Sequence, residues 1–201
     1  MAPGIKITPH PDQHKIASKL VTLGNSLDVS FSGELFRFIN PTYSKAADIV
    51  DGRGALHASG RWHVRGAARL SYTAMTPHTA LAETLAHVNY YSLPQAKALP
   101  RVLVALRLQA RRVLDLRDGH VRKTLRLSAD TIQTLDWRAD NQNGREAVTQ
   151  AWGGAFASAG FEAVIVPSAA DATGSNVLVY PENLKPGSHF ESAAPVEWPG
   201  K

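Results

Sequence analysis

Five polar side chains stand at the ends of apolar segments, where together they could do chemistry. Arg37 interrupts a strand-like run of bulky apolar residues, and Arg61 follows a glycine-rich stretch. Tyr72 ends a short apolar segment, Glu83 lies in a helical pattern, and Ser168 follows the apolar run EAVIVP. Arginine forms bidentate bonds with phosphate, an aromatic face attracts a cation, and a carboxylate stabilises developing positive charge. The set therefore contains groups for binding an anion and for stabilising a cation.

Each of these residues also has a plain structural explanation. Arg37 could extend its guanidinium into solvent from an edge strand, and Arg61 could cap a turn. Tyr72 could be a core tyrosine with a satisfied hydroxyl. Glu83 lies away from the apolar stripe of its helix, which is typical of a solvated face, and Ser168 after a proline is typical of a turn. Individually, none of the five indicates a function.

The apolar periodicity places these side chains on short helices and strands. Helices are predicted over 14–23, from 77 to about 91 and over about 148–159, with two short helices within 118–140. Strands are predicted over 34–39, 69–73, 100–109 with an extension over 111–116, 162–167 and 176–180. The predicted stripe of the second helix comprises Leu81, Thr84, Leu85 and Val88.

Three segments are predicted to lack regular structure. Glycines favour a loop over 51–60. The first twelve residues hold three prolines, and we expect them to be mobile. The tail from residue 186 is also proline-rich, and we expect it to lie on the surface or to fray.

Composition excludes several classes of protein. The chain has 201 residues, a net charge of +5, 44% apolar residues and 19% charged residues, which is typical of a globular protein rather than a polycation. Because cysteine is absent, disulfides, thiolate zinc sites and cysteine nucleophiles are excluded. No run approaches the ~18 consecutive apolar residues of a membrane helix, and the first residues lack a targeting pattern. We therefore expect a cytoplasmic protein.

Familiar motifs of hydrolases and nucleotide-binding proteins are absent from the sequence. There is no G-x-S-x-G, no G-x-x-x-x-G-K-[ST], no G-x-G-x-x-G after a strand and no H-E-x-x-H. Of the eight histidines only His57 and His63 lie close together, and their spacing fits neither one helical face nor a usual zinc pair. We expect no metal site and interpret both histidines as structural or incidental.

Four stretches taken together resemble the RES domain, named for its arginine, glutamate and serine. They are FRFINP with Arg37, SGRWHVRG with Arg61, LSYTAMTPHTALAETLAH with Tyr72 and Glu83, and VPSAADATGSNVLVYPEN with Ser168 and Asn176. Their order, spacing and flanking residues agree with the family over about residues 34–183. The stretch 89–143 matches no family residue that could be assigned a role.

The resemblance implies a fold and an activity. Members of the family resemble ADP-ribosyltransferases and form the toxin half of bacterial toxin–antitoxin pairs. They act on NAD, either splitting it with water or phosphate or moving its ADP-ribose onto a protein. We therefore expect a single α+β domain with a mixed, largely antiparallel core sheet and flanking helices. Residues 1–33 would be an N-terminal extension with a short helix, 34–183 the catalytic domain, and 184–201 a C-terminal tail.

The same resemblance assigns roles to the six residues, with NAD as substrate. Arg37 and Arg61 hold the pyrophosphate, and Tyr72 stacks on the nicotinamide ring. Glu83 bonds a ribose hydroxyl beside the developing cation, Ser168 orients the glutamate or the ribose, and Asn176 supports that loop. The expected catalytic residues are Glu83, Arg37 and Ser168, and the expected NAD-binding residues are Arg37, Arg61, Tyr72 and Asn176.

The family also implies a partner. An antitoxin, commonly with an Xre helix-turn-helix DNA-binding domain, would block the cleft in an oligomeric toxin–antitoxin complex. If the ADP-ribose is transferred to a protein, that target is a second partner. No membrane partner and no direct contact with nucleic acid are expected.

A different class of function remains open at this point. A basic cluster could bind nucleic acid, although it lacks interleaved aromatic residues and a known binding signature. It could equally face an acidic antitoxin. The cluster comprises Arg107, Arg111, Arg112, Arg117, Arg122, Lys123 and Arg126. A further alternative is an interaction domain without catalytic activity.

Overall fold

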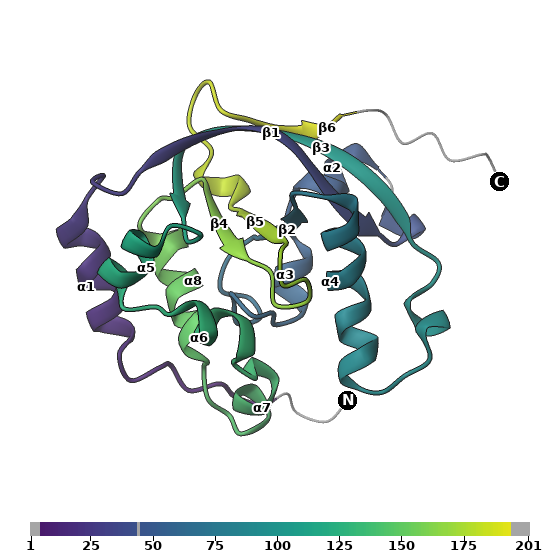
Figure 1. The fold of residues 1–201 in the computed structure, drawn as a ribbon, viewed down its shortest axis with the longest axis horizontal. Helices are drawn as coiled ribbons and strands as arrows, with labels where there is room; N and C mark the ends of the chain where they lie inside the picture. Colours follow the sequence, from purple (N-terminus) through teal and green to yellow (C-terminus); the bar gives the residue numbers. More distant parts are fainter. Residues whose placement is uncertain (1–4, 44, 194–201) are drawn as a thin grey trace.

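A sheet of six strands forms the centre of the part of the chain that the structure describes (Figure 1). The structure is a computed structural model, and it describes residues 5–43 and 45–193. The strands are β1 (Val29–Ile39), β2 (Ser71–Ala74), β3 (Val102–Asp115), β4 (Ala163–Pro167), β5 (Ser175–Val179) and β6 (His189–Ser192).

Short helices surround this sheet. The α-helices are α1 (Gln13–Leu23), α2 (Ala46–Val50), α3 (Gly54–His57), α4 (Pro77–Tyr90), α5 (Gly119–Leu125), α6 (Ala129–Thr134), α7 (Trp137–Gln142) and α8 (Val148–Ser158). Three 3₁₀ turns are η1 (Pro41–Tyr43), η2 (Gln95–Ala98) and η3 (Pro181–Asn183). Within the described ranges, no helix is both long enough and apolar enough to cross a membrane.

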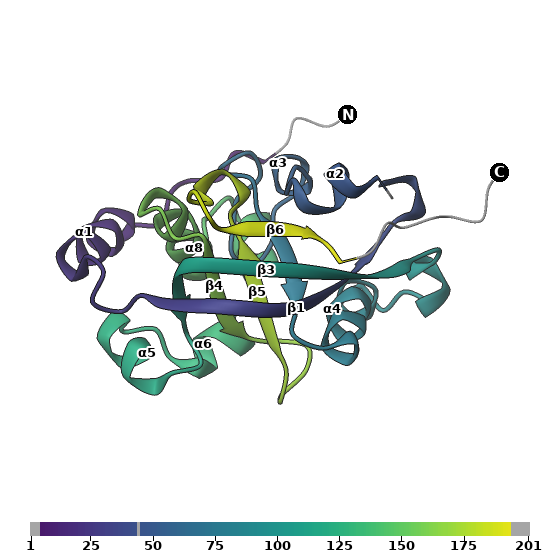
Figure 2. The same cartoon turned by 90° about the horizontal axis from the view of Figure 1, so that it is seen from above.

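The strands pair in the order β1-β2-β5-β4-β3-β6, and β1 also pairs along β3. All pairs are antiparallel except β3 with β4. Seen from above, β1, β3 and β6 run across β2, β4 and β5 (Figure 2). The prediction of an α+β domain with a mixed, largely antiparallel sheet and flanking helices is confirmed.

Both faces of β4 and β5 are buried, so their side chains divide two apolar cores. Ile165 and Val177 face a core against β1, β3 and β6, whereas Val164 and Leu178 face a core against α1, α5, α6 and α8. Successive side chains of a strand point to opposite faces, which explains why both strands read as unbroken apolar runs. The strand β4, which Ser168 directly follows, is therefore packed on both faces.

Several local predictions were wrong in their bounds. The predicted loop contains the single turn of α3, and three short helices occupy the region predicted to hold two. The strand predicted over 34–39 begins at Val29 because its exposed first half pairs with β3. The two segments 100–109 and 111–116 form the single strand β3, because β1 pairs along most of its length.

The two ends of the chain are more ordered than predicted. The N–H of Thr8 donates to the carbonyl of Gly144 over 2.8 Å, and the N–H of Glu146 donates to Thr8 over 2.9 Å. The C-terminal segment adds β6 to β3, with Phe190 buried in the core. Hydrogen bonds between backbone groups form without an apolar pattern in the sequence. The sequence of these proline-rich segments therefore gave no indication that they pair with other parts of the chain. Residues 1–4 and 194–201 of the predicted ends lie outside the described residues.

The start of α4 is as predicted, but its buried face differs. Thr76 caps the helix, and Pro77 occupies its first turn. Ala80 and Val88 are buried, whereas Leu81 is 44% exposed. The helix buries Ala80 in place of Leu81, and the predicted apolar stripe that began with Leu81 is therefore partly exposed to solvent.

Candidate active site

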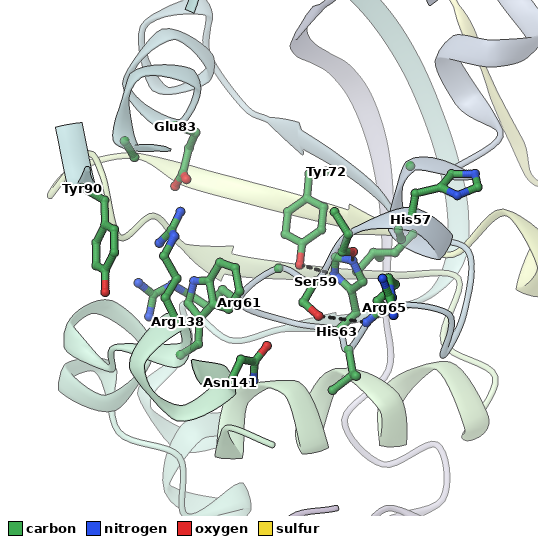
Figure 3. A pocket seen from close by; sticks show the side chains of 18 of the residues that line it. His57, Ser59, Arg61, His63, Arg65, Tyr72, Glu83, Tyr90, Arg138 and Asn141 are labelled. Carbon is green, nitrogen blue, oxygen red and sulfur yellow. Dashed lines mark hydrogen bonds between the residues drawn. The ribbon is translucent and has the colours of Figure 1, made fainter. Parts of the chain in front are cut away.

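A cavity of about 1270 Å³ brings together residues from distant parts of the chain. Four of the six predicted site residues line it: Arg37, Arg61, Tyr72 and Glu83. They come from β1, the loop after α3, β2 and α4, and three of them are seen around the cavity in Figure 3. These four predicted residues therefore meet at one place.

The other two predicted residues lie beside this cavity. Asn176 lines a smaller cavity of about 230 Å³, to which Arg37, Tyr72 and Glu83 also contribute. Ser168 lines neither of these two cavities and is 1% exposed. Both residues contact the site by hydrogen bonds to the Glu83 carboxylate.

The carboxylate of Glu83 is held at one of its two oxygens. Ser168 Oγ donates to Glu83 Oε1 over 2.6 Å, and Asn176 Nδ2 donates to the same oxygen over 2.5 Å. No described residue donates a hydrogen bond to Oε2. Charge-assisted bonds of this kind are short and strong, so the carboxylate is fixed in orientation while one oxygen stays available.

The hydroxyl of Ser168 is fully used. It accepts the N–H groups of Ala170 over 3.1 Å and Asp171 over 3.0 Å while it donates to Glu83. With both acceptor positions filled by backbone donors, its proton is directed at the carboxylate. The turn after β4 thus aims Ser168 at Glu83.

A second contact ties α4 to this turn. Thr79 Oγ1 donates to Asp171 Oδ2 over 2.7 Å, and the N–H of Thr79 donates to the cap Thr76 over 3.0 Å. The first turn of α4 is therefore anchored to the loop that carries Ser168. Glu83 lies one turn further along the helix, at a set distance from that loop.

Tyr72 is oriented by His63, one of the two histidines interpreted from the sequence as structural or incidental. Its hydroxyl accepts the N–H of Trp62 over 3.0 Å and lies 2.9 Å from His63 Nδ1. His63 Nε2 lies 2.7 Å from the carbonyl oxygen of Ala58, which can only accept. A neutral His63 therefore carries its proton on Nε2 and accepts the Tyr72 proton on Nδ1.

Burial shapes the titration of this pair. It raises the pKa of the Tyr72 hydroxyl well above the usual range. Burial also lowers the pKa of His63, partly offset by the bond to Ala58. Both side chains are therefore neutral near pH 7, and the phenol ring is held by two hydrogen bonds.

The loop that carries Arg61 is folded by buried contacts with α8. Gly60 and His63 exchange backbone hydrogen bonds of 3.0 and 3.3 Å. Gln150 Nε2 donates to the carbonyl of Gly60 over 2.9 Å and to that of His63 over 3.2 Å. At Gly153 an added Cβ would stand 1.8 Å from the carbonyl oxygen of Trp62, so only glycine permits this approach.

Arg61 leaves this loop toward the cavity. Its Nη1 donates to the carbonyls of Ile132 over 3.0 Å and Leu135 over 2.8 Å. Burial lowers its pKa, the charge of Glu83 raises it, and the charge of Arg138 lowers it. The guanidinium stays charged at neutral pH, and its Nε and Nη2 donate to no described residue.

Arg37 lines the cavity and also forms hydrogen bonds within the protein. Its Nη1 donates to the carbonyl of Ile49 over 3.1 Å and to Ser71 Oγ over 3.0 Å. Burial lowers its pKa, and the charge of Asp51 opposes this shift. The side chain does not extend into solvent from an edge strand, since β1 pairs with both β2 and β3.

Three residues of the site were missed by sequence reasoning. His63 had been interpreted as structural or incidental, Gln150 is a buried polar residue on an apolar helix, and Arg138 lies in the unassigned stretch 89–143. A polar residue on a helix with a strongly apolar face was a usable signal for Gln150. No local pattern pointed to Arg138. Among the described residues, no group of three or more His, Asp or Glu side chains could hold a metal ion.

Comparison with known proteins shows the family and the fold of the chain. A family model described as the RES domain matches residues 34–198, which include all six predicted site residues. The solved structure of the M. tuberculosis MbcT–MbcA toxin–antitoxin complex contains a similar chain, with a TM-score of 0.67 and 22% identity over 89% of each chain. At this identity the likeness concerns the fold. The search among curated proteins found no match.

The family match covers most of the chain and includes the two arginines and the glutamate that line the cavity, as well as the serine that bonds the glutamate. The chain belongs to the RES domain family.

Proposed function

We propose that the protein is the toxin of a toxin–antitoxin pair and consumes NAD by cleaving the bond between nicotinamide and ribose. The observation that carries this proposal is the carboxylate of Glu83, held at Oε1 by two donors while Oε2 is available beside a cavity with two arginines and a tyrosine. Membership of the RES family and a fold like that of MbcT, a chain of a toxin–antitoxin complex, support it.

The cationic side chains suit the binding of a dinucleotide. Arg37 and Arg61 both line the cavity and keep donors that no described residue accepts. Guanidinium groups form charge-assisted bonds with the two phosphates, and partial burial strengthens these bonds. We assign both arginines to the pyrophosphate of NAD.

Tyr72 suits the nicotinamide. Its hydroxyl is held by His63 and by the backbone of Trp62, so the ring itself remains to contact a substrate. The nicotinamide ring of NAD is cationic, and an aromatic face attracts a cation. A fixed ring would therefore hold the leaving group in one orientation.

Glu83 suits the bond that breaks. When the bond between C1′ and the nicotinamide nitrogen breaks, its electron pair moves to the ring nitrogen, which becomes neutral, and positive charge develops on the ribose. A carboxylate next to the ribose stabilises this charge and accepts a hydrogen bond from a hydroxyl. An acceptor then attacks C1′ and loses a proton.

Ser168 and Asn176 act through Glu83. Ser168 is buried and directs its proton to Glu83, and Asn176 donates to the same oxygen. We assign both residues as positioning residues that select one orientation of the carboxylate. The sequence assigned Ser168 to catalysis and Asn176 to NAD binding. We now assign to both residues the single role of orienting the Glu83 carboxylate.

The acceptor decides the reaction class, and the same residues serve three acceptors. Water gives an NAD glycohydrolase, phosphate gives a phosphorylase, and a protein side chain gives an ADP-ribosyltransferase. The first two are the primary proposal, and protein ADP-ribosylation at the same site is the alternative. The fate of the ADP-ribose distinguishes them.

The test is to incubate the purified protein with NAD, with and without phosphate and with and without cell lysate. We expect nicotinamide release, with the ADP-ribose found free, as its phosphate ester, or on a protein. Glu83→Gln keeps the size of the side chain and removes its charge, so release should fall by about 10²-fold or more. Glu191→Gln, exposed on β6, is the matched control. Absence of nicotinamide under every condition would remove the enzymatic proposal.

We further propose that an antitoxin covers the cavity, in an oligomeric complex in the cytoplasm, with a DNA-binding domain of the Xre kind. Its proposed docking surface includes the exposed part of the basic cluster. Arg107, Arg111, Arg117, Lys123 and Arg126 are exposed. Reversal of charge at Arg111 should weaken the complex, and an unchanged affinity would contradict this assignment.

The cluster is less suited to nucleic acid than its sequence suggested. Arg112 bonds Asp28 over 3.1 Å, Arg117 bonds Asp115 over 2.7 Å, and Arg122 donates to two backbone carbonyls. Three of the seven cations are therefore engaged within the protein. Retention on DNA that falls steeply with salt would favour the nucleic-acid alternative.

A further inference from the structure

Arg138 lines the cavity but has no role in the reaction proposed above. It stands in the first turn of α7, whose cap Asp136 accepts the N–H groups of Arg138 over 3.1 Å and Ala139 over 3.0 Å. Its side chain is half-buried and lines the cavity near Arg61 (Figure 3).

Two aromatic rings hold the side chain of Arg138. Its guanidinium carbon lies 4.7 Å from the ring centroid of Tyr90 and 4.5 Å from that of Trp137. The Tyr90 hydroxyl in turn donates to Asp136 Oδ2 over 2.9 Å. Contacts of this kind favour a defined position for the cation without using its N–H groups.

The N–H groups of Arg138 remain uncommitted. No carboxylate or carbonyl of the described chain accepts a hydrogen bond from its guanidinium. Its neighbour Asp136 is already engaged with two backbone N–H groups and with Tyr90. By contrast, Arg145, which follows α7 in the chain, is paired with Asp140 over 2.9 Å. Arg138 is thus a cation held in place by two aromatic rings, and its N–H groups can donate hydrogen bonds to a bound ligand.

Arg61 is close enough to sense both Glu83 and Arg138. The charge of Glu83 raises the pKa of Arg61, and the charge of Arg138 lowers it. Arginine forms bidentate bonds with phosphate, so two arginines that line the same cavity suit an anion with several oxygens. Arg61 lies close enough to Glu83 for the carboxylate charge to act on it, and Arg138 adds a second cation from α7.

We propose that Arg138 binds the phosphate on the adenosine side of the dinucleotide, while Arg61 and Arg37 bind the phosphate nearer the nicotinamide ribose. The proposal rests on NAD as the substrate. It makes Arg138 a residue that selects a dinucleotide over nicotinamide mononucleotide, which ends at a single phosphate.

The test compares these two substrates in the full-length protein. Arg138→Gln should raise KM for NAD by about 10- to 100-fold with little change in kcat, because a charge-assisted contact to a bound phosphate is lost. The kcat/KM for nicotinamide mononucleotide should stay the same. Arg138→Lys keeps the charge but not the planar group, and it should give a smaller loss. Arg101→Gln, at an exposed position that does not line the cavity, is the control.

Several results would overturn the proposal. An unchanged KM for NAD in Arg138→Gln shows that Arg138 is a surface residue, and an equal loss for both substrates shows that it acts on the fold or on the nicotinamide half. If the wild-type protein releases no nicotinamide at all, the proposed function fails instead. Calorimetry with ADP-ribose, which has both phosphates and no leaving group, then decides the role of Arg138 separately. Equal affinity in the wild type and Arg138→Gln, or no binding by either, contradicts it.

Discussion

His63 gives the folded protein a pH dependence that can be measured without a substrate. In the native state its Nδ1 accepts the Tyr72 proton, so a second proton on the ring would break this bond. Burial lowers the pKa of His63 below its usual 6.5. As the pH falls below 6.5, His63 of the unfolded chain takes up a proton, whereas His63 of the native chain stays neutral to a lower pH. The free energy of unfolding therefore falls with falling pH.

The magnitude follows from a single proton. While His63 stays neutral in the native state, the free energy of unfolding falls by up to about 1.4 kcal/mol per pH unit, and this full slope applies only where the unfolded histidine is fully protonated. Over the interval from about pH 7.5 to about pH 5.5 the unfolded histidine passes from mostly neutral to mostly protonated. The total loss over this interval is therefore at most about 1.4 kcal/mol. Carboxylates titrate mostly below this interval. Urea unfolding at the two pH values measures the difference directly.

A pair of variants assigns this loss to one histidine. His63→Asn retains a side-chain oxygen that can accept from Tyr72, and it does not titrate, so the pH-dependent loss should shrink. His57→Asn, at an exposed position, should behave as the wild type does. If His63→Asn keeps the full loss, or if His57→Asn removes it, the reasoning about the buried neutral histidine is wrong.

Two further predictions concern the helix behind the site and the positioning of the glutamate. Gly153→Ala places a Cβ 1.8 Å from the carbonyl of Trp62 and should cost about 3 kcal/mol of stability, whereas Gly154→Ala meets nothing within 4 Å and should add up to about 1 kcal/mol. Thermal unfolding of both variants checks this, and a shift of Tm in the same direction would contradict the packing of α8. Ser168→Ala removes one donor to Glu83, so nicotinamide release should slow by about 10-fold or more, with a stability loss of about 2 kcal/mol. Full activity in this variant would mean that Asn176 alone orients the carboxylate.

Local features of the sequence were reliable where their causes are local. The pair Thr76-Pro77 predicted the start of α4, because a cap and a fixed φ act within one turn. The apolar runs before Ser168 and around Asn176 predicted β4 and β5, because strands buried on both faces show no alternation. Segments held by backbone pairing to distant partners, such as β6 and the residues around Thr8, carried no comparable pattern.

The sequence by itself determined the inventory of the site. The types and order of Arg37, Arg61, Tyr72, Glu83 and Ser168 identified the RES family, and the absence of cysteine excluded thiolate chemistry. Chemistry depends on functional groups, and these are readable one residue at a time.

Only the tertiary structure decided how these groups act. Glu83 meets Ser168 and Asn176 across 85 and 93 residues, and these two contacts leave one carboxylate oxygen available. The partnership of His63 with Tyr72 and the uncommitted cation of Arg138 likewise depend on the packing of separate elements. The strength of a hydrogen bond or of an ion pair depends on distances of a few ångström and on burial. Periodicity along the chain describes neighbours within a turn or a strand, and it carries no information about such distances.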